Sequence, residues 1–591
     1  MTIRTNRLRL IALLFSATAL IGAAANAAQN QASRLPYKSF EELEAAIAKA
    51  KEGLWTKPVD AQTLIPLVRL CLADGELVYA EGNLDSVLKA DPKNIEALTL
   101  LGELRRSAYR FDEAIQVLAR AEAVDPAAVP VRLFKAALAM DRMDFSEART
   151  IFAKLADENP KLPDALCGLA EVAYWENRYD DSLKYIDQCL ALDPVFARAY
   201  LFKSLIHRIR QENDLWAAAG RKAVESDPFD ADARANLSNI LMRGEKKMEE
   251  GYVEAKLALK INRWNFAAHN YIGNGWSPKD YDDLKIADGA QTLLNEADAL
   301  LLSRRFVPAL KKFEEVLPML RGSEAIPALL GKGAIAYQMK DYDGAMDWFQ
   351  GILSYNPDYG MAHYGMAQSL LRKKDKINIR FAKIEKAFAA KDAPEPPFLR
   401  NVFINYKDLD PDLQKIIRMS VKPLRAFLQV DKEKGGTFYI TPFHKRQSEV
   451  PGMANLKGQR TFDLRLWDDV KGLGGRNALS GEDWERDVKY LRFNVVAHEF
   501  AHQIHRMLPA EIQKEIDRLY AKAKAERKTL DFYSDQNVME YFAVGVEAYV
   551  SEEKLADQKI AYGHVRKELL ERDPDLYKLI ERLDSMDSAG R

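Results

Sequence analysis

Three of the chain's eight histidines fall within eight consecutive positions, on a stretch whose apolar residues suit a buried helix. The stretch contains His498-Glu499-Phe500-Ala501-His502, an H-E-x-x-H motif. On a helix, His498 and His502 lie one turn apart on one face, so their imidazoles can share a metal ion. Glu499 lies where its carboxylate can reach a water on that metal. The motif therefore predicts a metal centre that activates water.

Two histidines do not complete such a centre, because a catalytic zinc usually has three protein ligands and one open position. His505 lies on the same face as His498 but about 10 Å along the axis, so we expect it behind the ligands or in the core. Glu540 and Glu547 lie on an apolar helix predicted over 537–550, where an acid is costly unless it is paired or metal-bound. These two acids share a face, so one can bind the metal while the other orients a ligand histidine or faces solvent.

The spacing of these residues resembles the gluzincin class of zinc metallopeptidases, which combine H-E-x-x-H on one helix with a ligand glutamate on a later helix. More narrowly, Glu540-Tyr541-Phe542-Ala543 resembles the E-F-F-A segment in the catalytic domain of anthrax toxin lethal factor and its relatives. The resemblance covers about residues 495–550. It implies that Zn²⁺ is the metal.

This resemblance also implies a role for each residue of the centre. His498, His502 and Glu540 are the implied zinc ligands. Glu499 is the implied general base, and Tyr533, seven residues before Glu540, is the implied donor to the oxyanion. The alternative for Tyr533 is an aromatic residue packed at the start of the helix.

One position departs from the family pattern. Val544 stands where the relatives carry a second glutamate. Glu547 then either takes over the role of that glutamate or is itself the third ligand in place of Glu540.

The first two thirds of the chain contain an internal repeat. Proline recurs every 34 residues, each time after Asp or Asn, at Pro92, Pro126, Pro160, Pro194 and Pro228. Small residues stand five positions after each of these prolines, at Ala97, Val131, Ala165, Ala199 and Ala233. A 34-residue period with small residues in phase is typical of the tetratricopeptide repeat, a stack of helix pairs whose concave surface binds proteins or peptides.

The repeat is interrupted at 273–278 and resumes near Asp288. A decayed repeat is the simpler explanation of this interruption, and a substrate-facing loop is the alternative. We expect two or three further helix pairs up to Ala390, followed by a proline-rich linker at 391–397.

The last third is predicted to be an α+β domain with the metal-binding pair on its first long helix. We expect a helix at 410–429 and strands at 437–441 and 461–466. Residues 472–475, which are rich in glycine, are predicted to form a loop. Further helices are expected at 509–528 and 537–550.

The N-terminus has the pattern of an export signal. Arg4, Arg7 and Arg9 precede an apolar stretch at 10–24, and Ala25-Asn26-Ala27 is a small-x-small cleavage site. We expect a cleaved signal peptide and a periplasmic or secreted protein without stable membrane insertion, the alternative being an anchor that stays attached. The three cysteines are too few for a disulfide scaffold, although Cys167 and Cys189 either pair or remain free thiols.

The charge balance gives no support for a nucleic-acid partner, because 86 Lys and Arg stand against 87 Asp and Glu. The predicted fold is mainly α, a tetratricopeptide-repeat solenoid followed by an α+β zincin-like domain. The predicted domains are a signal peptide at 1–27, repeats at 28–275, a second set of repeats at 276–390, a linker at 391–397 and the zincin-like domain at 398–591.

Two functions follow from these predictions. The first is an exported zinc metallopeptidase whose repeats bind a protein or peptide substrate or partner. The alternative is a repeat-based interaction scaffold with a catalytically silent zincin-like domain. The intact Glu499 favours the first, and hydrolysis of another amide, such as a cell-wall peptide, would use the same metal centre.

Overall fold

A computed structural model describes residues 35–54, 60–279, 281, 283–461, 464–484, 494–531, 534–551 and 564–586. The predicted signal peptide and Tyr533 lie outside these residues. The described chain forms two compact units: unit 1 holds Lys279–Gly365 and the residues from Ala382 onward, and unit 2 holds the residues up to Pro278 together with Met366–Phe381. Most of the described chain is helical, as predicted. No helix in the described part is long and apolar enough to cross a bilayer.

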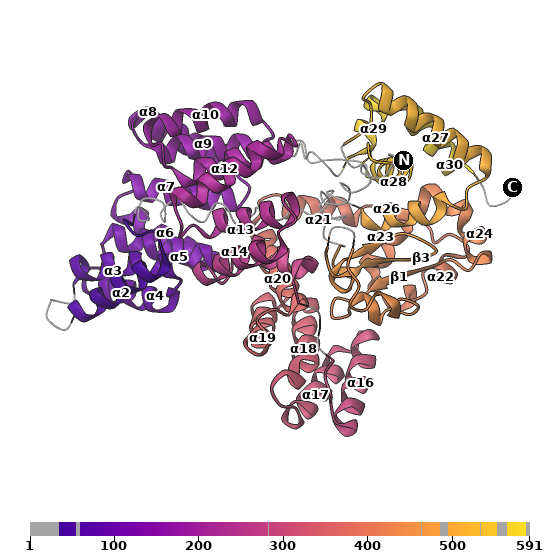
Figure 1. The fold of residues 1–591 in the computed structure, drawn as a ribbon, viewed down its shortest axis with the longest axis horizontal. Helices are drawn as coiled ribbons and strands as arrows, with labels where there is room; N and C mark the ends of the chain where they lie inside the picture. Colours follow the sequence, from indigo (N-terminus) through magenta and orange to yellow (C-terminus); the bar gives the residue numbers. More distant parts are fainter. Residues whose placement is uncertain are drawn as a thin grey trace, which may run out of the picture. The chain divides into compact units, whose positions relative to one another are not determined.

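Unit 2 consists of stacked antiparallel helix pairs, which Figure 1 shows in indigo to magenta. Its helices are α2 (Phe40–Gly53), α3 (Ala61–Asp74), α4 (Leu77–Ala90), α5 (Ile95–Ser107), α6 (Phe111–Val124), α7 (Val129–Asp141), α8 (Phe145–Glu158), α9 (Pro163–Trp175), α10 (Tyr179–Leu192), α11 (Ala197–Ile209), α12 (Asn213–Ser226), α13 (Ala231–Asn239), α14 (Met248–Ile261) and α15 (Phe266–Tyr271). α13 and α15 continue as the π-helical segments η3 (Ile240–Gly244) and η4 (Ile272–Trp276).

The 34-residue signature marks the turn between one helix pair and the next. Asp91 ends α4, and its side chain accepts a hydrogen bond from the backbone N–H of Lys93 at 3.2 Å, on the far side of Pro92. Asp125 and Asp193 make the same turn one and three periods later. This turn satisfies backbone groups where proline stops the helix. The alanines in phase with it, such as Ala97 and Ala165, are completely buried because two helices approach each other there.

The interruption at 273–278 is a buried helix end. Asn274 and Gly275 leave helical geometry, and Gly275 has a φ of 85° that favours glycine. Asn274 and Trp276 are both buried, so the segment packs into unit 2 and is not an exposed loop.

The interior of unit 2 contains paired charges. Arg106 on α5 donates to Glu103 and to Asp141 on α7, each at 2.7 Å. Lys374 on α20 (Gly360–Ile377) donates to the second oxygen of Asp141 at 2.9 Å. All four side chains are buried. The second half of α20 therefore packs inside the helix array of unit 2.

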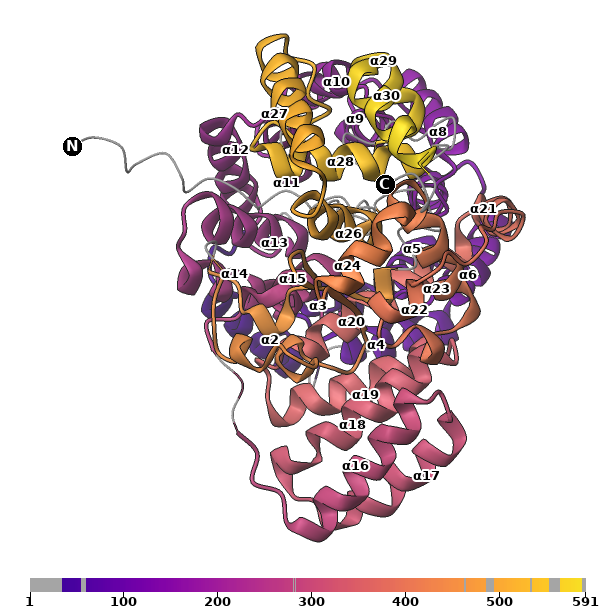
Figure 2. The same ribbon diagram turned by 90° about the vertical axis from the view of Figure 1, so that its right-hand side faces the viewer.

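Unit 1 begins with two more helix pairs, which Figure 2 shows side by side. They are α16 (Asp288–Leu302), α17 (Phe306–Val316), α18 (Ile326–Gln338) and α19 (Tyr342–Tyr355), followed by the start of α20. The remaining helices of unit 1 are α21 (Phe381–Ala389), α22 (Leu399–Val402), α23 (Pro411–Val421), α24 (Leu428–Glu433), α26 (Val495–His505), α27 (Ala510–Ala525), α28 (Val538–Val550), α29 (Arg566–Arg572) and α30 (Pro574–Asp584). The helix predicted at 410–429 is divided into α23, a 3-10 segment and α24.

Three short strands form a mixed sheet in the order β1-β3-β2. β1 (Thr437–Thr441) has its predicted bounds and runs parallel to β3 (Asn477–Gly481), which the sequence analysis did not predict. The loop predicted at 472–475 is wrong in part, because β2 (Gly472–Leu473) pairs antiparallel with β3. In place of the strand predicted at 461–466, the described residues show one bridge between Arg460 and Leu466. So small a sheet does not define a separate α+β domain.

The second repeat set packs against the C-terminal part within unit 1. Phe443, just after β1, stacks on Tyr337 of α18 with ring centroids 4.5 Å apart. His444 and Lys445 contact Asp298 of α16 at 2.8 and 2.9 Å. The stretch at 391–397, which was predicted to be a linker, lies within unit 1.

The three cysteines are buried free thiols. Cys189 donates a weak hydrogen bond to the carbonyl oxygen of Pro163 at 3.4 Å. Of the two alternatives for Cys167 and Cys189, the described structure thus has the unpaired one.

The charge cluster in unit 2 gives a test of the fold. Asp141→Ala is expected to lower the free energy of unfolding by about 3–5 kcal/mol, because it removes the carboxylate that two buried cations contact. Asp187→Ala is the control: Asp187 pairs with Lys203 on the surface, where its side chain is 67% exposed, and the loss should stay below about 1 kcal/mol. Urea unfolding followed by circular dichroism measures both, and equal losses would contradict the role given to Asp141.

Candidate metal centre

The helix that carries the H-E-x-x-H motif is fixed at its start and on its sheet-facing side. Asn494 caps α26 by accepting a hydrogen bond from the N–H of Ala497 at 3.0 Å, and it accepts another from Ser420 of α23. Gln503 donates from its side-chain amide to the carbonyl oxygens of Thr437 and Arg476, at 3.0 and 2.8 Å. The capped start and the link to the sheet set the rotation of α26, and thereby the directions of its histidines.

The helix that carries the two acids is fixed in a similar way. Asn537 caps α28 and accepts from the N–H of Glu540 at 3.0 Å. Tyr541 donates from its hydroxyl to Asp573 at 2.5 Å. Gly545 lets α30 approach closely, since a Cβ at this position would lie 2.5 Å from Leu576. α28 is therefore held between α26 and α30, with Glu540 in its first turn.

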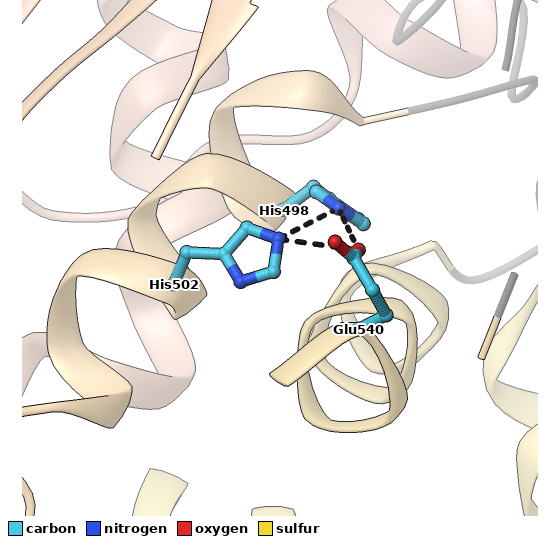
Figure 3. Close-up of side chains that lie close together, drawn as sticks. All are labelled: His498, His502 and Glu540. Atoms are coloured by element: carbon cyan, nitrogen blue, oxygen red, sulfur yellow. Dashed lines mark hydrogen bonds and ion pairs between the residues drawn. The ribbon is translucent and has the colours of Figure 1, made fainter. Parts of the chain in front are cut away.

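Figure 3 shows His498 and His502 pointing from α26 toward Glu540 on α28. The Nε2 atoms of the two histidines are 3.1 Å apart, and Glu540 Oε2 lies 3.2 Å from the first and 3.3 Å from the second. Ligand atoms about 2.0–2.1 Å from a tetrahedral zinc would be about 3.3–3.4 Å from one another. Among the described residues, this is the one cluster of His, Cys, Asp and Glu side chains close enough to hold a metal ion.

Glu547 lies behind the cluster of His498, His502 and Glu540. Its Oε2 is 3.4 Å from His498 Nδ1, the nitrogen that points away from Glu540, and Glu547 is only 3% exposed. A carboxylate on the second nitrogen of a ligand histidine fixes the tautomer and the ring orientation. Of the two roles open to Glu547, its position fits the orientation of His498.

The carboxylates around His498 favour a positive charge between α26 and α28. Burial by itself lowers the pKa of His498, but Glu540 and Glu547 outweigh burial and hold this pKa well above its ordinary value. Burial raises the pKa of Glu540, yet the two histidines outweigh it and hold this pKa below its ordinary value. Without a metal, a proton on His498 supplies the charge, and a bound cation would replace that proton.

Glu499 lies beside the three-residue cluster and is partly exposed. Burial raises its pKa above the ordinary value, although His498 and His502 act in the opposite direction. A Cβ on Gly472 would lie 2.7 Å from Glu499 Oε1, and a Cβ on Gly474 would lie 2.9 Å from Glu499 Oε2. The backbone around β2 therefore passes directly over the carboxylate, and only glycine fits there.

The remaining candidates are placed as follows. His505 is buried and packs on Phe542 of α28 with ring centroids 5.1 Å apart, in line with the expectation that it does not bind the metal. Burial lowers the pKa of His505 to about 4. Tyr533 lies outside the described residues. The sequence analysis missed Gln503 and Gly472, whose only sequence signal is their position next to the motif and in the glycine-rich run.

The donor set fits zinc. Two imidazoles and one carboxylate on three corners, with a nearby acid, match the ligands of catalytic zinc centres, and among the described residues no fourth side chain joins this cluster. The roles of His498, His502 and Glu540 as ligands stay a prediction.

Zinc content distinguishes the two acids of α28. Glu540→Ala is expected to abolish stoichiometric zinc binding, because it removes one corner of the cluster. Glu547→Ala should retain one zinc with an affinity about 10–100-fold lower, because it only frees His498 to turn. Metal analysis and chelator competition on the purified variants measure both quantities, and zinc lost only in Glu547→Ala would exchange the two roles.

Zinc affinity is also expected to depend on pH. The raised pKa of His498 means that a proton occupies the metal-free centre near neutral pH and must leave when zinc binds. Affinity should fall as the pH drops from 8 to 6, with about one proton released per zinc. Calorimetry in buffers of different ionisation enthalpy measures this proton, and His505→Gln should leave it unchanged because His505 is already neutral in this range. Binding without proton release would contradict the electrostatic account.

Comparisons with known proteins match the repeats. Sequence models described as tetratricopeptide repeat match residues 133–161 and 176–231, both within unit 2. No curated protein matches the chain.

Several solved structures are similar to this chain. Cut9–Hcn1, a hetero-tetramer of the APC/C, is 15% identical over 62% of this chain and 68% of its own, with a TM-score of 0.34. A tetratricopeptide repeat protein from Parabacteroides merdae is 14% identical over 52% of this chain and 98% of its own, with a TM-score of 0.24. YrrB, a TPR protein with an unusual peptide-binding site, is 17% identical over 36% of this chain and 95% of its own, with a TM-score of 0.18. Likeness at this level carries no functional argument.

The family matches and the regular helix pairs both indicate that the N-terminal part of the chain is built from tetratricopeptide repeats. The chain contains tetratricopeptide repeats and forms a helical solenoid of that type.

Proposed function

We propose that this protein is a tetratricopeptide-repeat scaffold that carries a zinc-dependent peptidase centre. The peptidase function is supported by the cluster of His498, His502 and Glu540, whose three facing atoms lie 3.1 to 3.3 Å from one another, with Glu499 beside them. The observation that carries the scaffold is the pair of family matches to the repeats.

The repeats support a protein or peptide partner. Stacked helix pairs of this type expose an extended surface whose side chains select a peptide or protein. The predicted signal peptide at 1–27 would place this interaction in the periplasm or outside the cell. The nearly neutral net charge of −1 adds nothing in favour of nucleic acid.

The chemistry follows from the positions of the side chains. A zinc ion bound by His498, His502 and Glu540 would lower the pKa of water and polarise the carbonyl of a peptide bond. Glu499 would accept a proton as the water attacks and deliver it to the leaving amine, so that no net proton is consumed. The partly exposed carboxylate of Glu499 has access to water, and its raised pKa brings it closer to the range in which it can both accept and release a proton.

The sheet beside the centre suits an extended peptide. β2 lies at the edge of the sheet, with β3 as its strand neighbour among the described residues. Extended peptides add to such an edge through main-chain hydrogen bonds. The glycines at 472 and 474 bring this part of the chain directly against Glu499. A polypeptide is therefore the substrate class that this arrangement favours.

The second candidate is a scaffold whose metal centre does not catalyse hydrolysis. The comparisons favour this candidate, because the family matches reach only the repeats. In that case His498, His502 and Glu540 would form a structural site that holds α26 and α28 together.

One substitution separates the two candidates. Glu499→Gln keeps the size of the side chain and is expected to lower the cleavage rate of an unstructured protein such as casein by at least about 100-fold, while one zinc remains bound. Glu511→Gln, on the exposed start of α27, is the control and should cleave like the wild type. A zinc-loaded wild type that cleaves neither casein nor a mixed peptide library faster than Glu499→Gln would overturn the peptidase and leave the scaffold.

A further inference from the structure

The hairpin formed by β2 and β3, residues 472–481, lies directly against the proposed general base, Glu499. A Cβ on Gly474 would lie 2.7 Å from His502 Cβ, and one on Gly472 would lie 2.7 Å from Glu499 Oε1. At such distances a shift of the hairpin by a fraction of an ångström changes the space around Glu499 and His502. Whatever holds the hairpin therefore sets the geometry of the centre.

The chain that enters the hairpin is held by the second repeat set. Asp469, three residues before β2, accepts a hydrogen bond from the Tyr281 hydroxyl, and a Cβ on Gly360 of α20 would lie only 2.6 Å from its other oxygen. Lys471, directly before β2, places its ammonium 4.8 Å from the ring centroid of Tyr364. Asp469 and Lys471 are 1% and 2% exposed, so these contacts are screened from water.

The chain that leaves the hairpin is held by the same repeats. Glu482, directly after β3, accepts from Arg304 at 3.0 Å and from Gln338 at 2.9 Å. Asp483 accepts a hydrogen bond from the Tyr364 hydroxyl. All of these donors lie between residues 279 and 365, and all of these contacts lie within unit 1.

We propose that the second repeat set, residues 279–365, holds the hairpin in place against the metal centre. In this proposal Tyr364 is a positioning residue of the centre. Tyr364 contacts both ends of the hairpin, with its ring under Lys471 and its hydroxyl on Asp483. The repeats in unit 1 thus serve catalysis directly, in addition to any binding of a partner. The catalytic part of this inference rests on the proposed peptidase, whereas the mechanical part does not.

Hydrogen exchange on the full-length zinc-loaded protein tests the mechanical part. Tyr364→Phe removes only the hydroxyl and is expected to speed exchange of the amides at 472–481 by about 10-fold, because a buried bond to a carboxylate is lost. Amides of α28 should exchange as in the wild type. Tyr355→Phe is the control, because Tyr355 ends α19 and is 50% exposed, with no hydrogen bond to the hairpin among the described residues.

Kinetics test the catalytic part. Tyr364→Phe is expected to lower kcat by about 10-fold or more with KM and zinc content unchanged, because a small misplacement near reacting groups is costly. Asp483→Asn keeps an acceptor for the Tyr364 hydroxyl and should retain most of the rate, whereas Asp483→Ala should lose it. If Tyr364 had only a structural role, Tyr364→Phe would lower the melting temperature but would not lower kcat while KM and zinc content stay unchanged.

The outcomes distinguish the claim that the repeats hold the hairpin from the claim that this contact supports catalysis. If amide hydrogen exchange at 472–481 is unchanged in Tyr364→Phe, the claim that the second repeat set holds the hairpin is wrong. Faster exchange with an unchanged kcat would overturn the positioning role. A wild type whose cleavage does not depend on Glu499 would overturn the proposed peptidase, and the exchange data would still decide whether the repeats hold the hairpin.

Discussion

One imidazole buried between two carboxylates is the interaction on which the C-terminal part of the molecule depends. His498 is 1% exposed, with Glu540 at its Nε2 and Glu547 at its Nδ1. Two buried carboxylates repel each other unless a positive charge lies between them, and leaving a buried charge uncompensated costs several kcal/mol. Either a proton on the imidazole or a cation bound to it meets this need. The contact between α26 and α28 is therefore coupled to protonation and to metal binding.

The surrounding elements can be understood as supports for that contact. Caps at Asn494 and Asn537 fix where the two helices begin, and Gln503 ties the first of them to the sheet. Glycines at 472, 474 and 545 let neighbouring chain segments approach more closely than any side chain would allow. These residues take no part in the proposed chemistry, but each of them restricts the movement of the helices that hold His498, His502 and Glu540 together.

The sequence predicted which side chains lie close together in the candidate centre better than it predicted the elements around them. His498 and His502 could be paired from helical spacing alone, because one turn of helix brings them together whatever the rest of the chain does. Glu540 and Glu547 could not be separated in this way, since they share a face of α28. Only the packing of α28 on α26 places one at Nε2 and the other at Nδ1 of His498. β2 escaped prediction because it is only two residues long, and β3 because its pairing with β1 joins residues 40 positions apart.

The repeats were predictable from their period, yet their relation to the C-terminal part was not. The 34-residue signature resides in local turn chemistry, such as the Asp91 turn, and local chemistry is visible in sequence. The packing of Phe443 on Tyr337 joins residues 106 positions apart and leaves no local trace. A proline-rich stretch thus resembles a domain boundary while it lies within one compact unit. If the centre is catalytic, the same repeat type then serves twice, once as a binding array and once as part of the enzyme.

X-ray absorption spectroscopy of the zinc-loaded protein tests the central claim most directly. We expect one zinc with two imidazole nitrogens and carboxylate oxygen at about 2.0–2.2 Å, and a fourth position filled by exchangeable water. A zinc with four protein ligands would be a closed structural site, and a protein that binds no zinc at all would have no centre. Either result would contradict a hydrolytic function for the cluster of His498, His502 and Glu540.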